Sequence, residues 1–179
     1  MPQPGADLET EVSLSFHEAV SGTTRSLTTN SGRKVQVKIP AGVNDGARIR
    51  VAGRGSQGTG GGPSGDLYVR VRASSHPVFG RSGRDLKLEV PITYAEAALG
   101  TKITVPTLDG RVTLRIPEGT QPGRRFKVSG KGVTTTKGTG DLIVTVMVTV
   151  PTDLDDEQRS LLEKLHAHQT ENPRDHLGV

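Results

Sequence analysis

The stretch KIPAGVNDGARIRVAGRG, residues Lys38–Gly55, has a near copy, RIPEGTQPGRRFKVSGKG, at Arg115–Gly132. In both copies a basic residue precedes Ile-Pro, two spaced glycines follow, and an arginine-containing alternation leads to Gly-x-Gly. Proline has no amide hydrogen to donate to a sheet, so it ends the first strand, and the glycines favour a turn. The alternation after the turn favours a second strand. The stretch therefore predicts strand, tight turn and strand, twice in one chain.

Two further blocks repeat in the same order on either side of this stretch. DLETEVSLSFHEAVSGT at Asp7–Thr23 matches DLKLEVPITYAEAALGT at Asp85–Thr101, and GDLYVRV at Gly65–Val71 matches GDLIVTV at Gly140–Val146. The spacing between copies shortens slightly along the chain, which places the length differences in loops. Three matched blocks indicate an internal duplication and therefore two similar domains.

The blocks themselves have the pattern of strands. Apolar and polar residues alternate after Leu8 and again before Pro40, which predicts strands with one buried and one wet face. The segments HEAVSG and AEAALG favour a single helical turn that stops at Gly22 and Gly100, where left-handed caps are expected. The repeated Gly-Asp-Leu at Asp66 and Asp141 is interpreted as a turn that leads into a strand.

Composition agrees with short strands and thin cores. Only 32% of the 179 residues are apolar and 3% aromatic, whereas 23 are glycine and 11 proline. We expect a mostly β protein with two tandem small β-sandwich domains and a short C-terminal helix. The predicted division is a linker remnant at 1–6, a first sandwich at 7–80, a second sandwich at 81–151, and a helix with a tail at 152–179.

The only long helix candidate is TDLDDEQRSLLEKLHAH, Thr152–His168. Thr152 or Asp153 can cap it, and acidic residues in its first turn suit the helix dipole. Its apolar side chains gather on one side, namely Leu154, Leu161, Leu162 and Leu165. Two interpretations stay open at this point: the leucines pack on their own domain, or they pair with another subunit.

Most catalytic and cofactor sites are excluded by residue type or context. The chain has no cysteine, no G-x-S-x-G motif and no histidine spacing suited to a metal. GRGSQG at Gly53–Gly58 fits a nucleotide pattern but runs into a glycine-rich loop instead of a helix. We therefore predict no enzyme activity, no metal and no cofactor.

The formal net charge of +4 is uneven, because residues 151–179 are net acidic. Few aromatic residues make nucleic acid an improbable partner, and no apolar run is long enough for a membrane span.

A binding surface for an extended partner remains. A small sandwich leaves strand edges unpaired, and an unpaired edge can hydrogen-bond to the backbone of another chain. Recognition by strand addition needs only that edge and apolar pockets for alternate side chains. The alternative hypothesis is a structural spacer and dimerisation module that binds no client polypeptide itself.

Together these blocks resemble the C-terminal substrate-binding region of DnaJ-type J-domain co-chaperones. The resemblance rests on the three repeated blocks and on GDLYVRVRASSHPVFGRSGRDL at Gly65–Leu86, and it covers almost the whole chain. It implies two β-sandwiches, a C-terminal homodimerisation element, a cytoplasmic location, and binding of unfolded client polypeptides for delivery to a DnaK-type chaperone. It favours subunit pairing for the helix at 153–168.

The resemblance also implies which residues contact partners. The client groove would be formed by the first sandwich and by the SHPVF segment, with Phe79 as its strongest candidate because it lies in a connection flanked by glycine and serine. The full set implied for the groove is Leu8, Leu27, Thr29, Val35, Val37 and Phe79. The acidic tail of the partner chaperone would meet basic residues near the groove, namely Arg33, Lys34, Lys38 and Arg48.

Two features depart from the family pattern. There is no His-Pro-Asp motif, since Val78 follows His76-Pro77, so this chain alone is not expected to stimulate a partner's ATPase. Many relatives also insert a cysteine-rich zinc module where this chain has only TTNSGRK, Thr28–Lys34. The chain either belongs to the zinc-free branch or has had the module deleted, and in both cases no zinc is expected.

Overall fold

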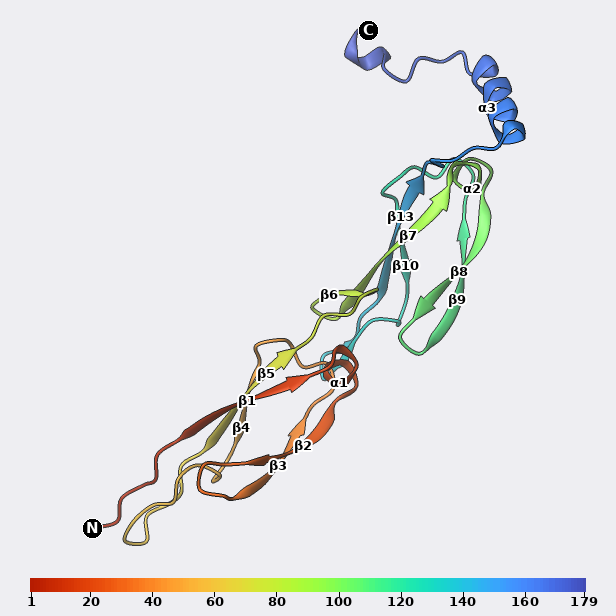
Figure 1. The fold of residues 1–179 in the computed structure, drawn as a ribbon. Coiled ribbons are helices and arrows are strands. Elements are labelled where there is room, and N and C mark those ends of the chain that lie inside the picture. Colours follow the sequence, from red (N-terminus) through yellow and green to blue (C-terminus); the bar gives the residue numbers. More distant parts are fainter.

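The computed structural model describes residues 1–179 as an elongated molecule. Two β-sandwiches lie end to end, and a helical C-terminal segment follows the second of them (Figure 1). The prediction of a mostly β chain with tandem sandwiches and a short C-terminal helix is confirmed. None of the helices is both long and apolar enough to cross a membrane.

The first sandwich contains β1 (Leu8–Leu14), α1 (Phe16–Ser21), β2 (Thr23–Thr28), β3 (Lys34–Ile39), β4 (Arg48–Val51) and β5 (Leu67–Ala73). One sheet has the order β1-β5-β4, with β1 parallel and β4 antiparallel to β5. The other is the antiparallel pair β2-β3. Buried valines, leucines and Ile39 fill the space between these sheets.

The second sandwich contains β6 (Gly80–Ser82), β7 (Asp85–Thr93), α2 (Tyr94–Leu99), β8 (Thr101–Thr107), β9 (Gly110–Ile116), β10 (Arg125–Val128), β11 (Thr134–Thr135), β12 (Gly138–Thr139) and β13 (Leu142–Thr149). Its main sheet has the order β10-β13-β7-β6, and β8-β9 forms the facing pair. β7 and β13 are parallel, as β1 and β5 are. The duplication seen in the sequence is therefore repeated in the topology, with β6 and the small β11-β12 hairpin added.

The repeated Ile-Pro stretch folds as the sequence predicts. β3 and β9 end immediately before Pro40 and Pro117, and β4 and β10 resume after the turns. Within the first turn, Gly42 and Gly46 have φ of 78° and 83°, a backbone region that favours glycine. Gly42 also approaches the second sandwich, because a Cβ there would lie 2.6 Å from the Thr134 carbonyl oxygen.

The one-turn helices also form, although their ends differ from the prediction. Ser15 and Glu18 form a capping box at α1, and Thr93 and Glu96 form one at α2. Gly22 ends α1 with φ 79° and ψ 159°, so it is not a left-handed cap. The chain turns directly into β2 at this point, and a Cβ on Gly22 would lie 2.8 Å from the Ala41 nitrogen.

Asp66 and Asp141 hold equivalent turns, which agrees with their structural interpretation. The Asp66 carboxylate accepts a hydrogen bond from the Gly53 amide at 2.9 Å, and Asp141 accepts one from Gly130 at the same distance. Two hydrogen bonds lower the pKa of Asp66 below its ordinary value: the one from the Gly53 amide has the larger effect, and the one from the Arg50 guanidinium the smaller. These aspartates therefore join strands and form no catalytic pair.

The linker between the sandwiches is residues 74–78, slightly before the boundary expected at residue 80. β6 already pairs with β7, and Phe79 belongs to the second apolar core. Arg81 of β6 reaches back to the first sandwich, where it donates hydrogen bonds to the carbonyl oxygens of Gly42 at 2.6 Å and Val43 at 2.8 Å. Partial burial lowers the pKa of the Arg81 guanidinium from its usual value. Arg81 thus fastens the two sandwiches together.

Replacing Arg81 with alanine should loosen this junction. The variant leaves two carbonyl oxygens of the Gly42 turn without their charged donor, so we expect the free energy of unfolding to fall by about 2 kcal/mol. Small-angle X-ray scattering should also show a broader distribution of molecular dimensions. Arg84→Ala is the matched control, because Arg84 is exposed and makes one hydrogen bond, to the Lys137 carbonyl. An Arg81→Ala chain as stable and extended as Arg84→Ala would contradict this role.

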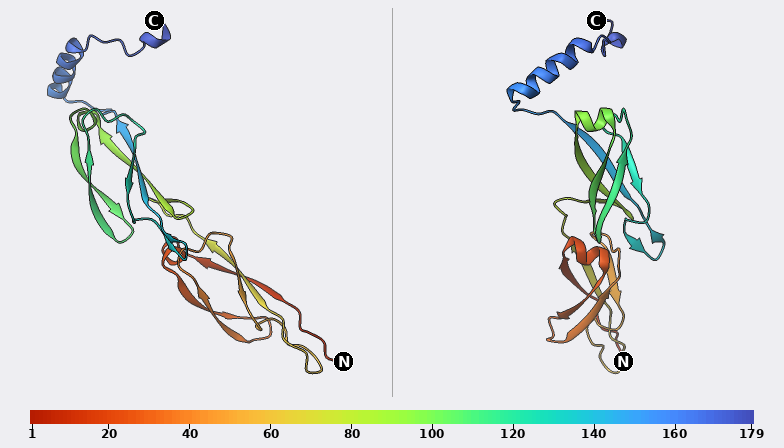
Figure 2. Two further views of the ribbon diagram at one scale, coloured as in Figure 1. Left: turned by 180° about the vertical axis from the view of Figure 1, so that it is seen from behind. Right: turned by 90° about the vertical axis from the view of Figure 1, so that its right-hand side faces the viewer.

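The two ends of the chain differ in how they are held. Residues 1–6, expected as a linker, hydrogen-bond to the glycine-rich loop before β5 through Gln3–Thr59 and Gly5–Pro63 contacts. At the other end, α3 (Asp156–His168) and a 3₁₀ turn, η1 (Asp175–Leu177), extend away from the second sandwich (Figure 2). α3 begins later than predicted, because Asp155 and Gln158 form its capping box.

Candidate functional site

The first sandwich has an open border between its two sheets. β1 pairs only with β5, and β2 pairs only with β3, so each has one edge without a strand. A shallow hollow of about 60 Å³ lies between these two edges. We call it the border groove; its lining is Leu8, Glu9 and Thr10 of β1, Leu27 and Thr28 of β2, Thr29 and Asn30 of the next turn, and Leu67 of β5.

The border groove opens into a larger hollow. This second space has a volume of about 750 Å³ and shares Leu8 and Asn30 with the groove. It extends past Arg33 to the Gly55–Gln57 loop. The β2-β3 turn is closed by hydrogen bonds between Thr29 and Arg33, so the short TTNSGRK segment completes the hairpin without any inserted module.

In the second sandwich, the chain itself covers the start of the equivalent border, at residues 85–87 of β7. β6 pairs with the edge of β7 that corresponds to the open edge of β1, with Arg81 opposite Leu86. Leu86 corresponds to Leu8 in the repeat and is 0% exposed, whereas Leu8 is half-buried. Val105, the counterpart of Leu27, is likewise buried. The first sandwich therefore leaves the start of this border unpaired beside the partly exposed Leu8 and Leu27, whereas the second sandwich covers the equivalent segment.

The structure brings together three of the six residues predicted for the groove. Leu8, Leu27 and Thr29 line it. Val35 and Val37 do not, because their side chains are buried in the core of the first sandwich. The alternation of β3 points both valines inward, opposite Leu27 and Arg25 of β2, so they support the groove from beneath.

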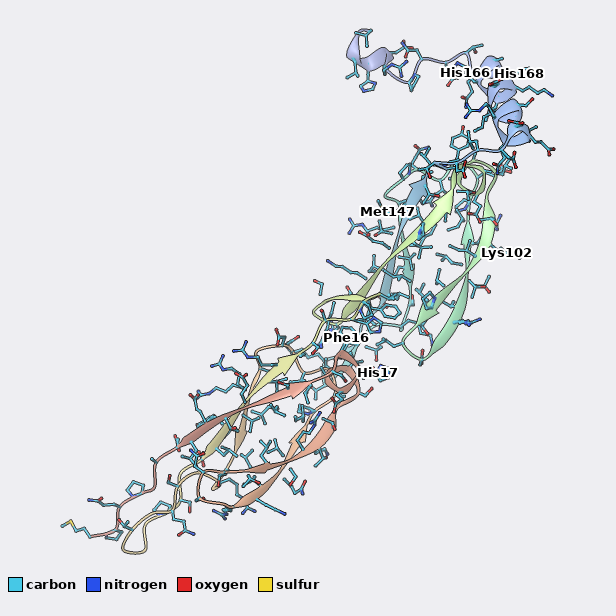
Figure 3. The ribbon with its side chains drawn as sticks, viewed as in Figure 1. Phe16, His17, Lys102, Met147, His166 and His168 are labelled. Carbon is cyan, nitrogen blue, oxygen red and sulfur yellow. The ribbon has the colours of Figure 1, made fainter.

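The prediction for Phe79 is wrong in this structure. Its side chain is 6% exposed and packs in the core of the second sandwich. The His76 ring lies 5.1 Å from the Phe79 ring and 5.3 Å from the Phe16 ring, between centroids. Phe16, which Figure 3 shows where the two sandwiches meet, packs against the same cluster as Phe79. The bulky residue in this connection therefore has a structural role.

Several groove residues were missed from the sequence. Glu9, Thr10, Thr28 and Asn30 are polar and gave no hydrophobic signal, while Leu67 looked like an ordinary core residue. Their common feature is position: they flank Leu8 and Leu27 on the two free edges or lie behind Leu8 on β5. The pairing of β1 with β5, in which Leu8 lies opposite Leu67, could have indicated Leu67.

The basic residues predicted near the groove occupy different surfaces. Arg33 is half-buried and lines the larger hollow. Lys34 and Lys38 are exposed on the outer face of β3, and neither they nor Arg33 forms an ion pair. Arg48 is already engaged, because it contacts Glu9 at 2.8 Å and lies 4.0 Å above the Tyr68 ring. Arg33 is thus the cation best placed for a ligand in the groove.

The C-terminal helix leaves its leucines uncovered. Leu161 is 58% exposed and Leu165 40%, Leu162 is also exposed, and Leu154 lies half-buried before the helix begins. One hydrogen bond links this segment to the second sandwich, from Gln169 Nε2 to the Tyr94 hydroxyl at 3.0 Å. Leu99 of α2 is 73% exposed at the same end of the molecule. Of the two interpretations left open, packing of the leucines on their own domain is wrong.

Comparison with known proteins gives a consistent result. Residues 8–151 match the family described as the DnaJ C terminal domain. The chain is 52% identical over 148 residues to the chaperone protein DnaJ of Brevibacillus choshinensis, covering 82% of this chain and 40% of that protein. It is 53% identical over 150 residues to chaperone protein DnaJ 1 of Streptomyces coelicolor, covering 82% and 38%. For chaperone protein DnaJ 2 of Nocardia farcinica the values are 54% over 136 residues, covering 75% and 35%. The chain thus spans about two fifths of the length of these relatives.

Proposed function

The chain belongs to the DnaJ C-terminal domain family, and we propose that it binds unfolded polypeptide in the border groove for delivery to a DnaK-type chaperone in the cytoplasm. The single observation that carries this proposal is the unpaired border of the first sandwich between Leu8 and Leu27. The matched relatives are named as chaperones and none as an enzyme, which agrees with the absence of a catalytic motif in the sequence.

Strand addition explains how one groove can accept many sequences. A client segment lies along the free edge of β1 or β2 and forms backbone hydrogen bonds, which do not depend on its side chains. Alternate client side chains then point toward Leu8 and Leu27. Both leucines are partly exposed, so a client side chain can bury the remaining part of their surface. The groove therefore selects a client sequence only by requiring an apolar residue at the client positions that face it.

The energetics favour a weak, reversible complex. Covering an apolar client side chain contributes about 1.5–3 kcal/mol, and each backbone hydrogen bond adds about 1 kcal/mol net. Ordering each client residue costs about 1–2 kcal/mol. With one or two anchored side chains and a few hydrogen bonds, these gains and costs largely offset each other, so the complex is weak. Such affinity allows the client to be released to the partner chaperone.

The acidic tail of the partner chaperone has a basic surface beside the groove. Arg33 lines the larger hollow and has no carboxylate partner within the chain, so a tail carboxylate can pair with it. Lys34 and Lys38 extend the positive charge along β3. Arg48 would have to leave Glu9 before it could contribute. We rank Arg33 first among these four contacts.

Homodimerisation is proposed through the C-terminal segment. Leu161, Leu162 and Leu165 form an apolar stripe without cover, and Tyr94 and Leu99 lie exposed at the adjoining end of the second sandwich. Burying both surfaces against a second copy removes this apolar area from water. Two border grooves on one dimer can then hold one unfolded chain at two points.

The function can be tested by aggregation of a denatured enzyme in the absence of ATP. We expect this chain to suppress aggregation, and we expect an excess of an apolar, extended peptide to abolish the suppression by occupying the border groove. A charged peptide of equal length is the control. Failure to suppress aggregation, or suppression that the apolar peptide leaves unchanged, would overturn the proposal. The first of these outcomes would favour the alternative of a spacer and dimerisation module.

The closed border of the second sandwich predicts the stoichiometry of binding. Because β6 covers the start of that edge and Leu86, the counterpart of Leu8, is buried there, we expect one short apolar peptide per chain in isothermal titration calorimetry. The peptide should cause chemical shift changes in β1 and β2 and leave β7 and β8 unchanged. A second equivalent site, with shifts in β7, would contradict this prediction.

A further inference from the structure

The outward strand positions of two hairpins carry positive charge and no acidic residue, while Asp109 in the β8-β9 turn pairs with Lys131. The outward positions of β2-β3 and β8-β9 hold five cations, namely Lys34, Lys38, Lys102, Arg111 and Arg115. The remaining outward positions are threonine, serine, glutamine and proline. We call these outward positions the hairpin face. No aspartate or glutamate lies on it, and none of its cations forms an ion pair.

The opposite sheet of the first sandwich shows how the same chain balances charge elsewhere. Arg48 pairs with Glu9 at 2.8 Å, Arg50 with Asp66 at 2.8 Å and Arg72 with Glu11 at 2.9 Å. Each cation named there has a carboxylate on a neighbouring strand or at a strand end. Of the outward cations of that sheet only Arg70 has no ion pair, whereas none of the cations of the hairpin face has one.

The arrangement on β8-β9 works against folding. Lys102 lies directly opposite Arg115 in the strand register, and like charges in this position destabilise a sheet. Lys102, Arg115 and Glu118 line one hollow of about 580 Å³, but Glu118 forms no ion pair with either cation. Folding would favour a carboxylate at one of these positions. Lys102 and Arg115 thus have no ion-pair partner within the sandwich and remain available to carboxylates of another molecule.

The position of the hairpin face connects it with the border groove. Both hairpins lie on the same long side of the molecule, as Figures 1 and 2 show, and Lys102 projects outward from β8 in Figure 3. Thr28 belongs to both surfaces, since it is exposed on β2 and lines the groove. No aromatic side chain lies on the hairpin face, so it offers no platform for stacking nucleic-acid bases.

From this placement we infer that the hairpin face binds acidic segments of an unfolded polypeptide whose apolar part occupies the border groove. This inference rests on the proposed function and adds a preference: clients in which an apolar anchor is followed or preceded by aspartate and glutamate. Carboxylates on the client supply the counter-charges that the hairpin face lacks. The interaction is exposed to solvent, so it is weakened by salt.

The inference can be tested with three peptides of about 30 residues, which reach up to roughly 100 Å when extended. All share one apolar anchor, and their flanks are rich in glutamate, glutamine or lysine. Fluorescence anisotropy at low salt should give a Kd about tenfold lower for the glutamate peptide than for the glutamine peptide, with the lysine peptide weakest. The advantage of the glutamate peptide should disappear at about 1 M salt.

Two charge variants locate the effect. Lys102→Gln with Arg115→Gln should remove most of the preference for the glutamate peptide and leave binding of the glutamine peptide unchanged. Lys87→Gln with Lys127→Gln is the matched control, because it removes the same charge from exposed positions of the opposite sheet. Lys102 and Arg115 are exposed, and removing their repulsion does not threaten the fold.

The outcomes separate this inference from the proposed function. If all three peptides bind equally well, or if the control variant loses the preference to the same degree, the hairpin face has no such role, while binding at the groove still stands. If the anchor peptides do not bind at all, the proposed function fails first. A single-stranded nucleic acid of equal charge that binds the face more tightly than the glutamate peptide would also overturn the inference.

Discussion

Replacing Leu27 with aspartate should weaken binding of an apolar peptide by about a hundredfold. Leu27 lines the border groove from β2 and remains partly exposed, so the substitution removes an apolar contact and places a charge where an apolar client side chain must pack. Losing that contact accounts for about 1.5–3 kcal/mol, and desolvating the carboxylate adds to the loss. Fluorescence anisotropy with a labelled apolar peptide measures the change directly.

Two further variants keep this prediction testable if Leu27→Asp disturbs the sandwich. Leu8→Ala removes a smaller contact on the facing edge and should weaken binding by about tenfold. Val78→Asp places the same charge on an exposed residue of the linker, outside the groove, and should leave affinity unchanged. Circular dichroism establishes which variants are folded. Unchanged affinity in folded Leu27→Asp and Leu8→Ala chains would show that the peptide binds elsewhere.

Replacing both Leu161 and Leu165 with aspartate should convert a dimer into a monomer. Both side chains are exposed on α3 and none of the helix is buried, so the substitutions do not disturb the sandwiches. Multi-angle light scattering should give twice the chain mass for the original protein and the single mass for the variant. Lys164→Asp, on the same helix, is the control and should remain dimeric.

The same substitutions should reduce the avidity for long clients. A denatured protein that contacts both grooves of a dimer gains about 10²- to 10⁴-fold in affinity from the second contact. We expect the monomeric variant to lose this gain and to bind a short peptide with unchanged affinity. If the double variant is still a dimer, the subunit interface lies outside α3. If the unmodified chain stays monomeric at high concentration, the proposal of a homodimer is wrong.

The architecture could be predicted because the same sequence blocks occur in both halves of the chain. Proline and glycine at matched positions indicate the strand ends and the turns around Gly42 and Gly119, and the matched blocks indicate two similar domains. The edges of the helices were harder to predict. Several residues near the start of α3 can act as its N-cap. The helix is capped by Asp155, not by Thr152 or Asp153, because Gln158 completes the capping box of Asp155.

The site was predicted only in part, since a pattern of alternating residues does not distinguish a core position from a border position. Val35 and Leu27 have the same kind of side chain and lie opposite each other in the β2-β3 register, yet Val35 is buried while Leu27 is half-buried. The difference arises from tertiary structure: Val35 packs in the core of the first sandwich, whereas Leu27 borders the groove between β1 and β2. Phe79 was misplaced for a similar reason, because its burial depends on contacts between the two sandwiches.

The copy of the border in the second sandwich clarifies what makes the first one suitable for binding. Both borders descend from the same sequence pattern, with Leu8 matching Leu86 and Leu27 matching Val105. In the second sandwich, β6 covers the start of this border, and Phe79 packs in the core beside it. The first border lacks such a strand, and its apolar residues stay half-exposed. An unfolded polypeptide would play the part that β6 plays in the second sandwich.

The most direct test of strand addition is a backbone N-methylation scan of one apolar peptide, measured by its affinity for the chain. A strand that pairs with a single edge uses the amide hydrogens of alternate residues only. We therefore predict that methylation weakens binding at every second residue and has little effect between these positions. Affinity that depends on the peptide's side chains but is equally insensitive to methylation at all positions would contradict strand addition at the border groove.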